Sequence, residues 1–303
     1  MAEYHIPVLF EESLEALNIK ENGIYIDATF GGGGHSKGIL AKLGPSGKLF
    51  SFDQDADAKN NAADLIGDKR FTFIAANFRH MAKYLRMFSI KKVDGILADL
   101  GISSHQIDEP SRGFSTRFDG PLDMRMNQEA DIKAFDVINK YSEKDLHKIL
   151  GMYGEVKNAK TLANAIVVAR SSKKIETIAE LKTVLNKFAP RGKENKYLAQ
   201  VFQGIRIEVN QELEALKEFL MEAPDLLNTE GRLCVIAFHS LEDRLVKNFI
   251  RSGKFSGDVD KDFYGHEIRP LESISRKPIV ASSIEMERNG RSRSAKLRIA
   301  ELK

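Results

Sequence analysis

The sequence has little cysteine and no long apolar run, and each of these shortages excludes a class of protein or site. Its 303 residues include one cysteine, Cys234, which rules out an internal disulfide and a cysteine-based zinc site. Cys234 stands in an apolar run, which favours a buried, inert thiol. No stretch reaches the ~20 apolar residues that a membrane-spanning helix needs, and residues 1–12 lack the pattern of a secretion signal. We therefore expect a cytoplasmic protein with no membrane partner.

An excess of charge of one sign is also missing from the chain as a whole, but not from all its parts. The formal net charge is +3. Residues 131–206 contain 15 Lys and Arg against 8 Asp and Glu, and residues 288–303 contain six basic residues against one acidic residue. Positive charge gathered in two segments suggests a polyanionic partner. The alternative interpretation is that these basic residues lie on ordinary solvent-exposed faces and bind no partner.

Strand and helix patterns alternate over the first hundred residues. Residues 1–22 predict a lead-in helix, and strands are expected at 24–26, 48–52, 71–75 and 93–98 with helical segments at 37–43, 56–66 and 79–88. Such alternation predicts a parallel sheet with right-handed crossovers. Ligands of such sheets bind beyond the carboxyl ends of the strands, so functional residues are expected just after each strand.

The pattern changes after residue 99. Residues 103–128 resemble a loop, helical periodicity runs from 132 to about 209, and a long helix is expected over 196–221. A strand returns at 232–238, and segments 279–281 and 295–300 are expected to form an antiparallel hairpin at a sheet edge. The prediction is an α/β, Rossmann-like fold with an inserted all-helical domain. The expected boundaries are 1–107 and 209–303 for the α/β domain and 108–208 for the insertion.

A glycine-rich stretch after the first strand is the strongest local signal. Asp27 ends the strand, four glycines follow at 31–34, and a helix starts. Glycine lets the backbone approach a ligand, and the N–H groups of the helix start face it. Ser36 occupies the place of the third glycine of the dinucleotide motif. The spacing from Asp27 to Gly31 and Gly33 is closer to the first motif of S-adenosylmethionine (SAM) enzymes, while a tight structural turn is the alternative.

Polar or aromatic residues follow the next three strands. Asp53 ends the second strand, where an acidic side chain accepts hydrogen bonds from ribose hydroxyls in both NAD and SAM sites. Phe78 is placed to contact an adenine ring, although a core role suits it nearly as well. Asp99 ends the fourth strand, where amino-group methyltransferases carry an acidic, Asn or Ser residue. A carboxylate that accepts the N–H of an exocyclic amine makes that poor nucleophile more reactive.

A His-Ser-acid cluster follows the strand at 232–238. Ser240 lacks the G-x-S-x-G context of a hydrolase, and adjacent residues do not form a triad. We expect instead that Ser240 caps a helix, with Asp243 completing a capping-box-like start, and that His239 faces the cleft. The other histidines show no metal-ligand spacing, so no metal is expected.

Taken together, these stretches resemble one family over nearly the whole chain: the bacterial small-subunit ribosomal RNA cytosine-N4 methyltransferases, known as RsmH or MraW. The resemblance rests on several long motifs that occur in order. They are His5-x-Pro-Val-Leu9, Tyr25-Ile-Asp-x-Thr-Phe-Gly-x-Gly-Gly-His-Ser36, Asp94-Gly-Ile-Leu-x-Asp-Leu-Gly-x-Ser-Ser104, Asp119-Gly-Pro-Leu-Asp-Met-Arg-Met126, Phe238-His-Ser-Leu-Glu-Asp-Arg244 and Arg291-Ser-Arg-Ser-Ala-Lys-Leu-Arg298.

The resemblance implies SAM-dependent methylation of N4 of a cytidine in the decoding region of small-subunit (16S) rRNA. We expect this rRNA to be bound within the assembled or nearly assembled subunit, with naked RNA as the open alternative. It also implies an inserted helical domain that recognises the substrate. From their positions alone, and not from the resemblance, residues 112–126 and His239 are expected to line the substrate side, and His239 joins Asp99 as a catalytic candidate. The residues implied to contact SAM are Gly33, Gly34, His35, Asp53, Phe78, Asp99 and Gln106.

Two other functions remain open at this stage. The glycine turn and Asp53 also suit an NAD-dependent dehydrogenase, although the missing third glycine disfavours it. A non-catalytic ribosome-assembly factor could keep the fold and bind RNA through the basic segments. The oligomeric state, monomer or homodimer, is open as well.

Overall fold

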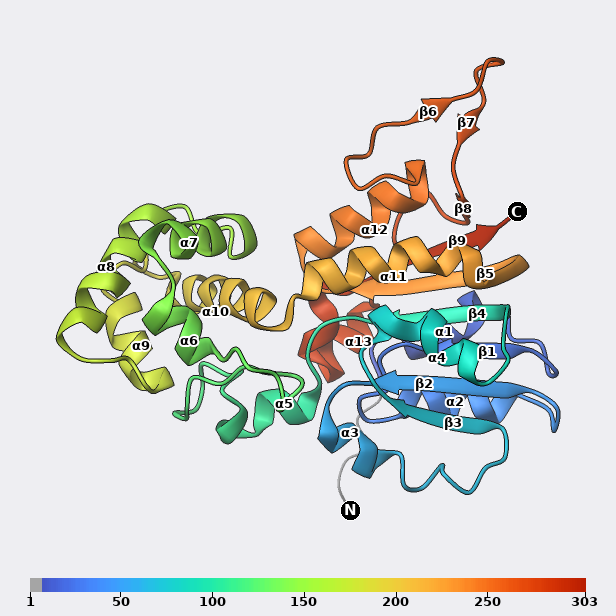
Figure 1. Cartoon of the computed structure of the whole chain (residues 1–303), viewed down its shortest axis with the longest axis horizontal. Coiled ribbons are helices and arrows are strands. Elements are labelled where there is room, and N and C mark those ends of the chain that lie inside the picture. The colour runs from blue at the N-terminus through green and yellow to red at the C-terminus, as the bar shows by residue number, and fades with distance from the viewer. Residues whose placement is uncertain (1–6) are drawn as a thin grey trace. The chain divides into compact units, whose positions relative to one another are not determined.

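The computed structural model describes residues 7–303 (Figure 1). His5 and the first part of the expected lead-in helix therefore lie outside the described residues. The chain divides into two compact units, one made of Met1–Gly101 with Leu213–Lys303 and the other of Ile102–Glu212. The expected domain boundaries, 107/108 and 208/209, stay predictions, and the divisions between the two units fall at 101/102 and 212/213.

A seven-stranded mixed sheet forms the centre of the first unit. Its strand order is β3-β2-β1-β4-β5-β9-β8, and β9 is antiparallel to both of its neighbours. The parallel part and the antiparallel last strand confirm the predicted α/β, Rossmann-like class. The strands are β1 Ile24–Asp27, β2 Lys48–Asp53, β3 Phe71–Ala75, β4 Val93–Asp99, β5 Leu227–Ala237, β8 Leu271–Ser273 and β9 Lys296–Leu302.

Helices cover both faces of this sheet, because successive strand residues point to opposite sides. In β1, Tyr25 packs into the cluster that α1, α2 and α3 join, whereas Ile26 packs into the cluster of α4, α11 and α12. Both side chains are fully buried. The helices are α1 Phe10–Ala16, α2 Gly34–Lys42, α3 Ala56–Asn61, α4 Met81–Met87, α11 Glu212–Leu226, α12 Ser240–Ser252 and α13 Ser283–Arg288.

Two sequence-based expectations about this unit are wrong. The long helix expected over 196–221 is two helices, α10 Glu194–Asn210 and α11, because Gln211 between them adopts a left-handed conformation with φ of 50°. The hairpin expected from 279–281 and 295–300 is reduced to one bridge between Ile279 and Leu297. The last strand, β9, lies between β5 and β8 rather than at the sheet edge.

The second unit is built from helices around its own apolar core. Fully buried side chains such as Leu150, Leu162 and Ile205 belong to this core. One isolated bridge joins Pro121 to Thr177. The helices are α5 Ser104–Asp108, α6 Ala134–Lys140, α7 Glu143–Lys148, a π-helical segment Ile149–Tyr153, α8 Ala159–Ser172, α9 Ile178–Leu185 and α10 Glu194–Asn210.

A small hairpin projects from the first unit beyond α12 (Figure 1). Its strands are β6 Asp260–Lys261 and β7 Glu267–Ile268, which pair with each other and not with the large sheet. Among residues 7–303, no helix is both long and apolar enough to cross a membrane.

Candidate active site

The turn from β1 to α2 leaves its helix start without a side-chain cap. Gly33 occupies the cap position with φ of 76°, a left-handed conformation that glycine adopts without strain. The first N–H groups of α2, which begins at Gly34, have no carbonyl acceptor one turn earlier in the helix. They are therefore available to a ligand at the carboxyl edge of the sheet.

The four glycines of this turn fall into two pairs. A Cβ at Gly33 would lie 2.6 Å from the Phe30 ring, and a Cβ at Gly34 would lie 2.3 Å from Pro7. Packing against protein therefore explains the glycines at these two positions. A Cβ at Gly31 or Gly32 would meet nothing within 4 Å, so the open side of the turn is at the first pair, which the sequence-based site did not include.

Asp53 ties the end of β2 to this turn. Its carboxylate accepts hydrogen bonds from the N–H of Gly31 at 2.8 Å and from that of Asp55 at 2.8 Å. Burial raises the pKa of Asp53 to about 6, and the two N–H donors oppose that rise. Each oxygen still has a lone pair free for hydroxyl donors, which suits the predicted contact with a ribose.

A buried polar network, which sequence reasoning missed, supports the turn from below. Asp27 accepts a hydrogen bond from the Ser36 hydroxyl at 2.6 Å, and that hydroxyl lies 2.8 Å from the Ser51 hydroxyl. Thr29 accepts a hydrogen bond from the N–H of Asp99 at 2.6 Å. The network fixes the ends of β1, β2 and β4 relative to one another. The partners lie up to 70 positions apart in the sequence, so no local pattern reveals the network.

Asp99 and His35 lie side by side at this edge. His35 Nε2 is 3.6 Å from Asp99 Oδ2, and the His35 side chain is 5% exposed. Burial lowers the pKa of His35, but the nearby Asp99 and Asp27 raise it more, and the net shift is upward. Asp99 Oδ1 is buried and has no hydrogen-bond partner among residues 7–303. A buried oxygen without a partner is costly unless a ligand satisfies it, so Asp99 is a strong candidate to hold one.

Phe78 follows β3 in a short 3-10 helix, Phe78–His80. Its ring meets that of Phe219 edge to face, with centroids 5.3 Å apart, and it is half-buried against the core of the first unit. Part of the ring is therefore structural and part is accessible. This geometry is compatible with both roles that the sequence left open.

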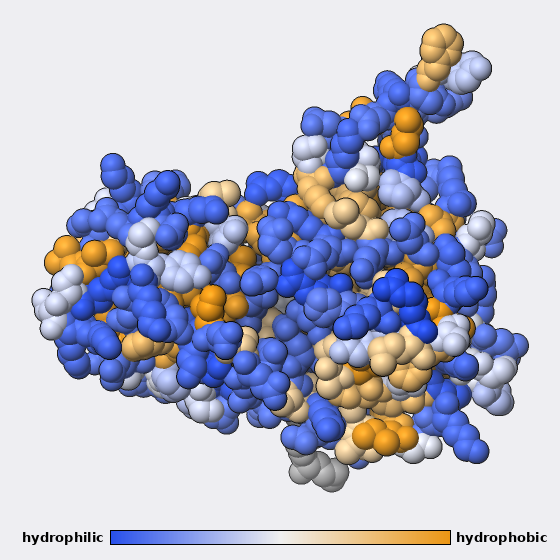
Figure 2. All heavy atoms as spheres, in the orientation of Figure 1, coloured by the Kyte–Doolittle hydropathy of each residue, from blue (hydrophilic) through white to orange (hydrophobic). Residues whose placement is uncertain are grey.

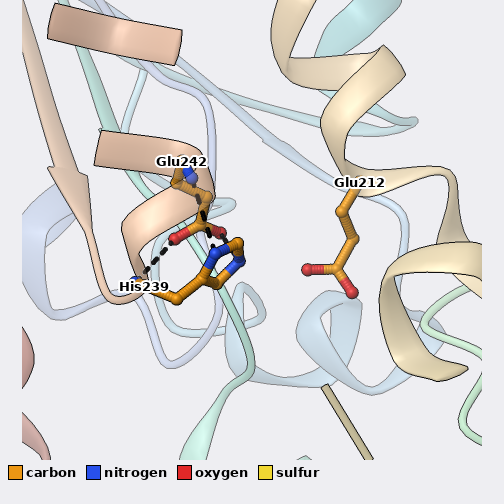
Figure 3. A group of neighbouring side chains, drawn as sticks. All are labelled: Glu212, His239 and Glu242. Atoms are coloured by element: carbon orange, nitrogen blue, oxygen red, sulfur yellow. Dashed lines mark hydrogen bonds and ion pairs between the residues drawn. The ribbon is translucent and has the colours of Figure 1, made fainter. Parts of the chain in front are cut away.

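The turn from β5 to α12 is closed by its own side chains (Figure 3). Glu242 accepts hydrogen bonds from the N–H groups of Phe238 at 2.9 Å and His239 at 3.3 Å, and His239 Nδ1 accepts one from the N–H of Glu242 at 3.4 Å. His239 is thus the cap and Glu242 completes the capping box, so the expected Ser240–Asp243 cap is wrong. Glu212, also drawn in Figure 3, is the last residue of the second unit.

Comparison with known proteins identifies the family. The model of the MraW methylase family matches residues 2–303. A Cytophaga hutchinsonii protein named ribosomal RNA small subunit methyltransferase H is 61% identical over 98% of this chain and 99% of its own length. A Flavobacterium johnsoniae protein of the same name is 56% identical over 99% and 98%. The chain belongs to the MraW methylase family.

A more distant likeness joins this methylase to a solved structure from Clostridium thermocellum, titled a putative rRNA-methylase. That chain is 15% identical, with a TM-score of 0.47, over 99% of this chain and 100% of its own. Likeness at this level adds nothing to the family assignment, which rests on the family model and the sequence relatives.

S-adenosylmethionine is the methyl donor of this methylase, and the first unit has the features such a ligand needs. The open backbone at Gly31 and Gly32, the Asp53 carboxylate and the partnerless Asp99 oxygen all stand at the ends of neighbouring strands. His35 is nearly buried beneath the turn, so its predicted contact with SAM would have to come through its backbone N–H. The SAM contacts themselves remain predictions for all seven residues.

Gln106 of this methylase lies in the second unit, at the start of α5. Ser103 and Gln106 form a capping box in which the Gln106 amide oxygen accepts the N–H of Ser103 at 3.0 Å. The Gln106 side chain is thus held in a fixed position. Its contact with SAM stays a prediction.

Half of the six basic residues in the last segment of the methylase, residues 288–303, are paired with acidic side chains within the first unit. Lys296 and Arg298 both bind the Asp243 carboxylate, at 3.0 and 2.6 Å, and Lys303 pairs with Glu272. These three cations serve to hold β9 against its neighbours, so only part of the segment's charge is left for a polyanionic partner.

Proposed function

We propose that this methylase transfers a methyl group from SAM to the exocyclic N4 of a cytidine in the decoding region of small-subunit rRNA. Two relatives at 56% and 61% identity over nearly the full length are named for methylation of small-subunit rRNA. The choice of an amino nitrogen rests on the chemistry of the site, above all on Asp99.

The partnerless Oδ1 of Asp99 is the observation that carries the proposal. The N4 lone pair of cytosine is delocalised into the ring, so the amine is a poor nucleophile. A carboxylate that accepts its N–H increases electron density on nitrogen and fixes its direction of attack. Asp99 is held in place by the Thr29 hydroxyl, which accepts its N–H at 2.6 Å.

The chain lacks the residue that methylation of a cytosine ring carbon requires. Methylation at C5 begins with a thiolate that adds to the ring. Cys234, the single cysteine, is fully buried in β5, and burial raises the pKa of its thiol to about 12. It therefore supplies no nucleophile at neutral pH, which favours the amine over the ring carbon.

The first unit would hold the cofactor with the residues already described. SAM supplies a methyl group on a positively charged sulfur, and the reaction releases S-adenosylhomocysteine and a proton. Asp53 would accept the ribose hydroxyls, the backbone at Gly31–Gly34 would face the rest of the ligand, and the exposed part of Phe78 would contact the adenine ring.

The helical second unit would recognise the rRNA, with the assembled or nearly assembled small subunit as the substrate. Residues 131–206, most of this unit, contain 15 basic against 8 acidic residues, which suits a phosphate-rich partner. Residues 112–126 and His239 are the remaining candidates for the substrate side. His239 is already engaged at the start of α12, so we rank it below Asp99 as a catalytic residue.

The test is transfer of tritiated methyl from SAM to small subunits that lack the modification. We expect label in the 16S rRNA, recovered as N4-methylcytidine after digestion to nucleosides. Label in 5-methylcytidine, or in another RNA, would overturn the assignment. No incorporation by wild-type protein that binds SAM would leave only the RNA-binding assembly role.

A further inference from the structure

The second half of α12 borders a basic pocket in the first unit. The pocket has a volume of about 390 Å³ and is also lined by the start of the projecting hairpin's return strand, by β8 and by β9. Lys247, Arg251, Arg269, Arg276 and Arg298 line it, against one acidic residue. Basic residues from four separate segments therefore converge on one hollow.

Two of these five cations are neutralised and three are not. Arg298 binds Asp243 at 2.6 Å, and Arg269 lies within 4 Å of two glutamates. Lys247, Arg251 and Arg276 are exposed, and none of them pairs with an acidic side chain within the described part of the chain. Three like charges around one pocket repel one another unless an anion enters it.

The hairpin beside the pocket carries two aromatic side chains at its tip. Phe263 is 98% exposed and Tyr264 is 82% exposed, with their ring centroids 5.7 Å apart. Figure 1 shows the hairpin projecting beyond α12, and Figure 2 shows apolar atoms at its outer end. The two rings meet edge to face, with 88° between their planes. Their remaining open faces can stack on the unpaired bases of single-stranded RNA.

The tip is held in a defined shape. Asp262 Oδ1 accepts the N–H groups of Tyr264 and His266, each at 2.9 Å, and the N–H of Asp262 donates to the carbonyl of His266. Gly265 takes a left-handed conformation, with φ of 88°. An ordered tip loses less conformational entropy when it binds than a flexible one would.

We propose that the pocket and the hairpin form an RNA-binding arm, defined by Lys247, Arg251, Arg276, Phe263 and Tyr264. The three cations bind the phosphates of an rRNA strand, and the two rings stack on unpaired bases of the same strand. The inference deepens the proposed function, on which it rests for the identity of the polymer, by adding a contact outside the catalytic residues.

The position of the arm separates it from the candidate active site. Lys247 and Arg251 lie in the second half of α12, whereas the helix begins at Ser240, next to the carboxyl end of β5. None of the five arm residues belongs to the predicted SAM or catalytic set. Substitutions in the arm are therefore expected to leave SAM binding unchanged.

The test compares two double variants with a matched control. Arg251→Ala/Arg276→Ala removes two unpaired charges, Phe263→Ala/Tyr264→Ala removes both rings, and Arg86→Ala/Lys91→Ala removes two exposed, unpaired charges near the opposite, amino end of β4. Calorimetry with SAM checks the fold of each. The probes are a fluorescein-labelled single-stranded RNA of mixed sequence and unmodified small subunits, each titrated at several salt concentrations.

We expect different signatures from the two arm variants. The arginine variant should bind RNA more weakly, with a slope of log K against log salt smaller by about 1.4, because each phosphate contact to a single strand contributes roughly 0.7. The aromatic variant should bind at least about 30-fold more weakly with an unchanged slope, because two stacked bases are lost and stacking is not ionic. The control should match the wild type.

Other outcomes would contradict the proposal of an RNA-binding arm. If the arginine variant has the same slope of log K against log salt as the control, the cations of the arm do not bind RNA phosphates. An aromatic variant that loses affinity for subunits but not for RNA indicates a ribosomal protein as the partner instead. RNA binding is measured here without methyl transfer, so a wild type that binds through the arm but does not methylate rRNA would overturn the proposed function and leave the arm standing.

Discussion

Two strand-to-helix turns at the carboxyl edge of the sheet differ in whether side chains cap the helix that follows. The turn from β1 to α2 has Gly33 at its cap and no side chain on its N–H groups. The turn from β5 to α12 is closed by His239 and Glu242, which satisfy one another's backbone N–H groups. Both turns follow parallel strands, where ligands are expected to bind, but only the first leaves its donors available.

The comparison extends to the acidic residues of the two turns. Glu242 is 3% exposed, and its carboxylate accepts hydrogen bonds from the N–H groups of Phe238 and His239. Asp99, beside the open turn, keeps a buried oxygen without a partner in the described chain. Buried polar groups that the protein satisfies indicate structure, whereas an unsatisfied one needs a partner from outside the chain, such as a ligand or a water. The following predictions test that distinction.

Asp99→Ala should have the largest effect. Removing the acceptor for the amine N–H should lower turnover by about 10²–10⁴-fold, the usual range for a positioned group that handles a proton. Methyl transfer to unmodified small subunits measures turnover, and calorimetry measures SAM affinity separately.

Asp99→Asn is the matched control, since its amide oxygen still accepts a hydrogen bond but carries no charge. It should keep more turnover than Asp99→Ala. Full activity in the alanine variant would remove Asp99 from catalysis and make its partnerless oxygen uninformative.

Asp53→Ala should have the next largest effect, on the cofactor rather than on chemistry. Loss of the hydrogen bonds to the ribose hydroxyls should weaken SAM binding by about 1.5–3 kcal/mol. Calorimetry gives the affinity, and thermal unfolding without SAM shows how much of the change comes from losing the bonds to Gly31 and Asp55. An unchanged affinity would place the ribose contact elsewhere.

The parallel part of the fold was predictable because its signals are local. Apolar strands and amphipathic helices alternate, so the strand bounds agree within one residue for β1 to β4. Asp53 and Asp99 could be placed at the strand ends for the same reason. The break at Gln211 was not predictable, because helical periodicity continues across it and Asn210 is held by the backbone of Met124 and Met126.

The capped turn shows a different limit. The acidic residue three positions after the cap is a known signal, and Glu242 stands in that place. His239 is not among the usual cap residues, so the sequence favoured Ser240 and shifted the cap by one position. The hydrogen bond between Thr29 and Asp99 could not be predicted from the sequence for another reason, because only the folded sheet brings the two residues together.

Glu242→Ala tests the closed turn and should affect stability more than chemistry. Leaving the partly buried N–H groups of Phe238 and His239 without their acceptor should cost about 1–3 kcal/mol in the free energy of unfolding. Denaturant titration measures this, with Glu15→Ala, at an exposed position of α1, as the control. SAM affinity under native conditions should not change, and a large loss of SAM binding without a loss of stability would assign the closed turn to the ligand site.

The smallest effect concerns the pH dependence of SAM binding at the open turn. Burial raises the pKa of Asp53 to about 6, so the carboxylate is ionised above that pH and protonated below it. Ribose hydroxyls donate to the ionised form, so SAM affinity should be constant above about pH 6 and fall by up to tenfold for each unit below it. Asp53→Asn, which does not titrate, should bind weakly at every pH without this decline. If the variant keeps the same decline, another group, such as the neighbouring His35, controls the pH dependence, and the comparison of the two turns would then rest on Asp99 alone.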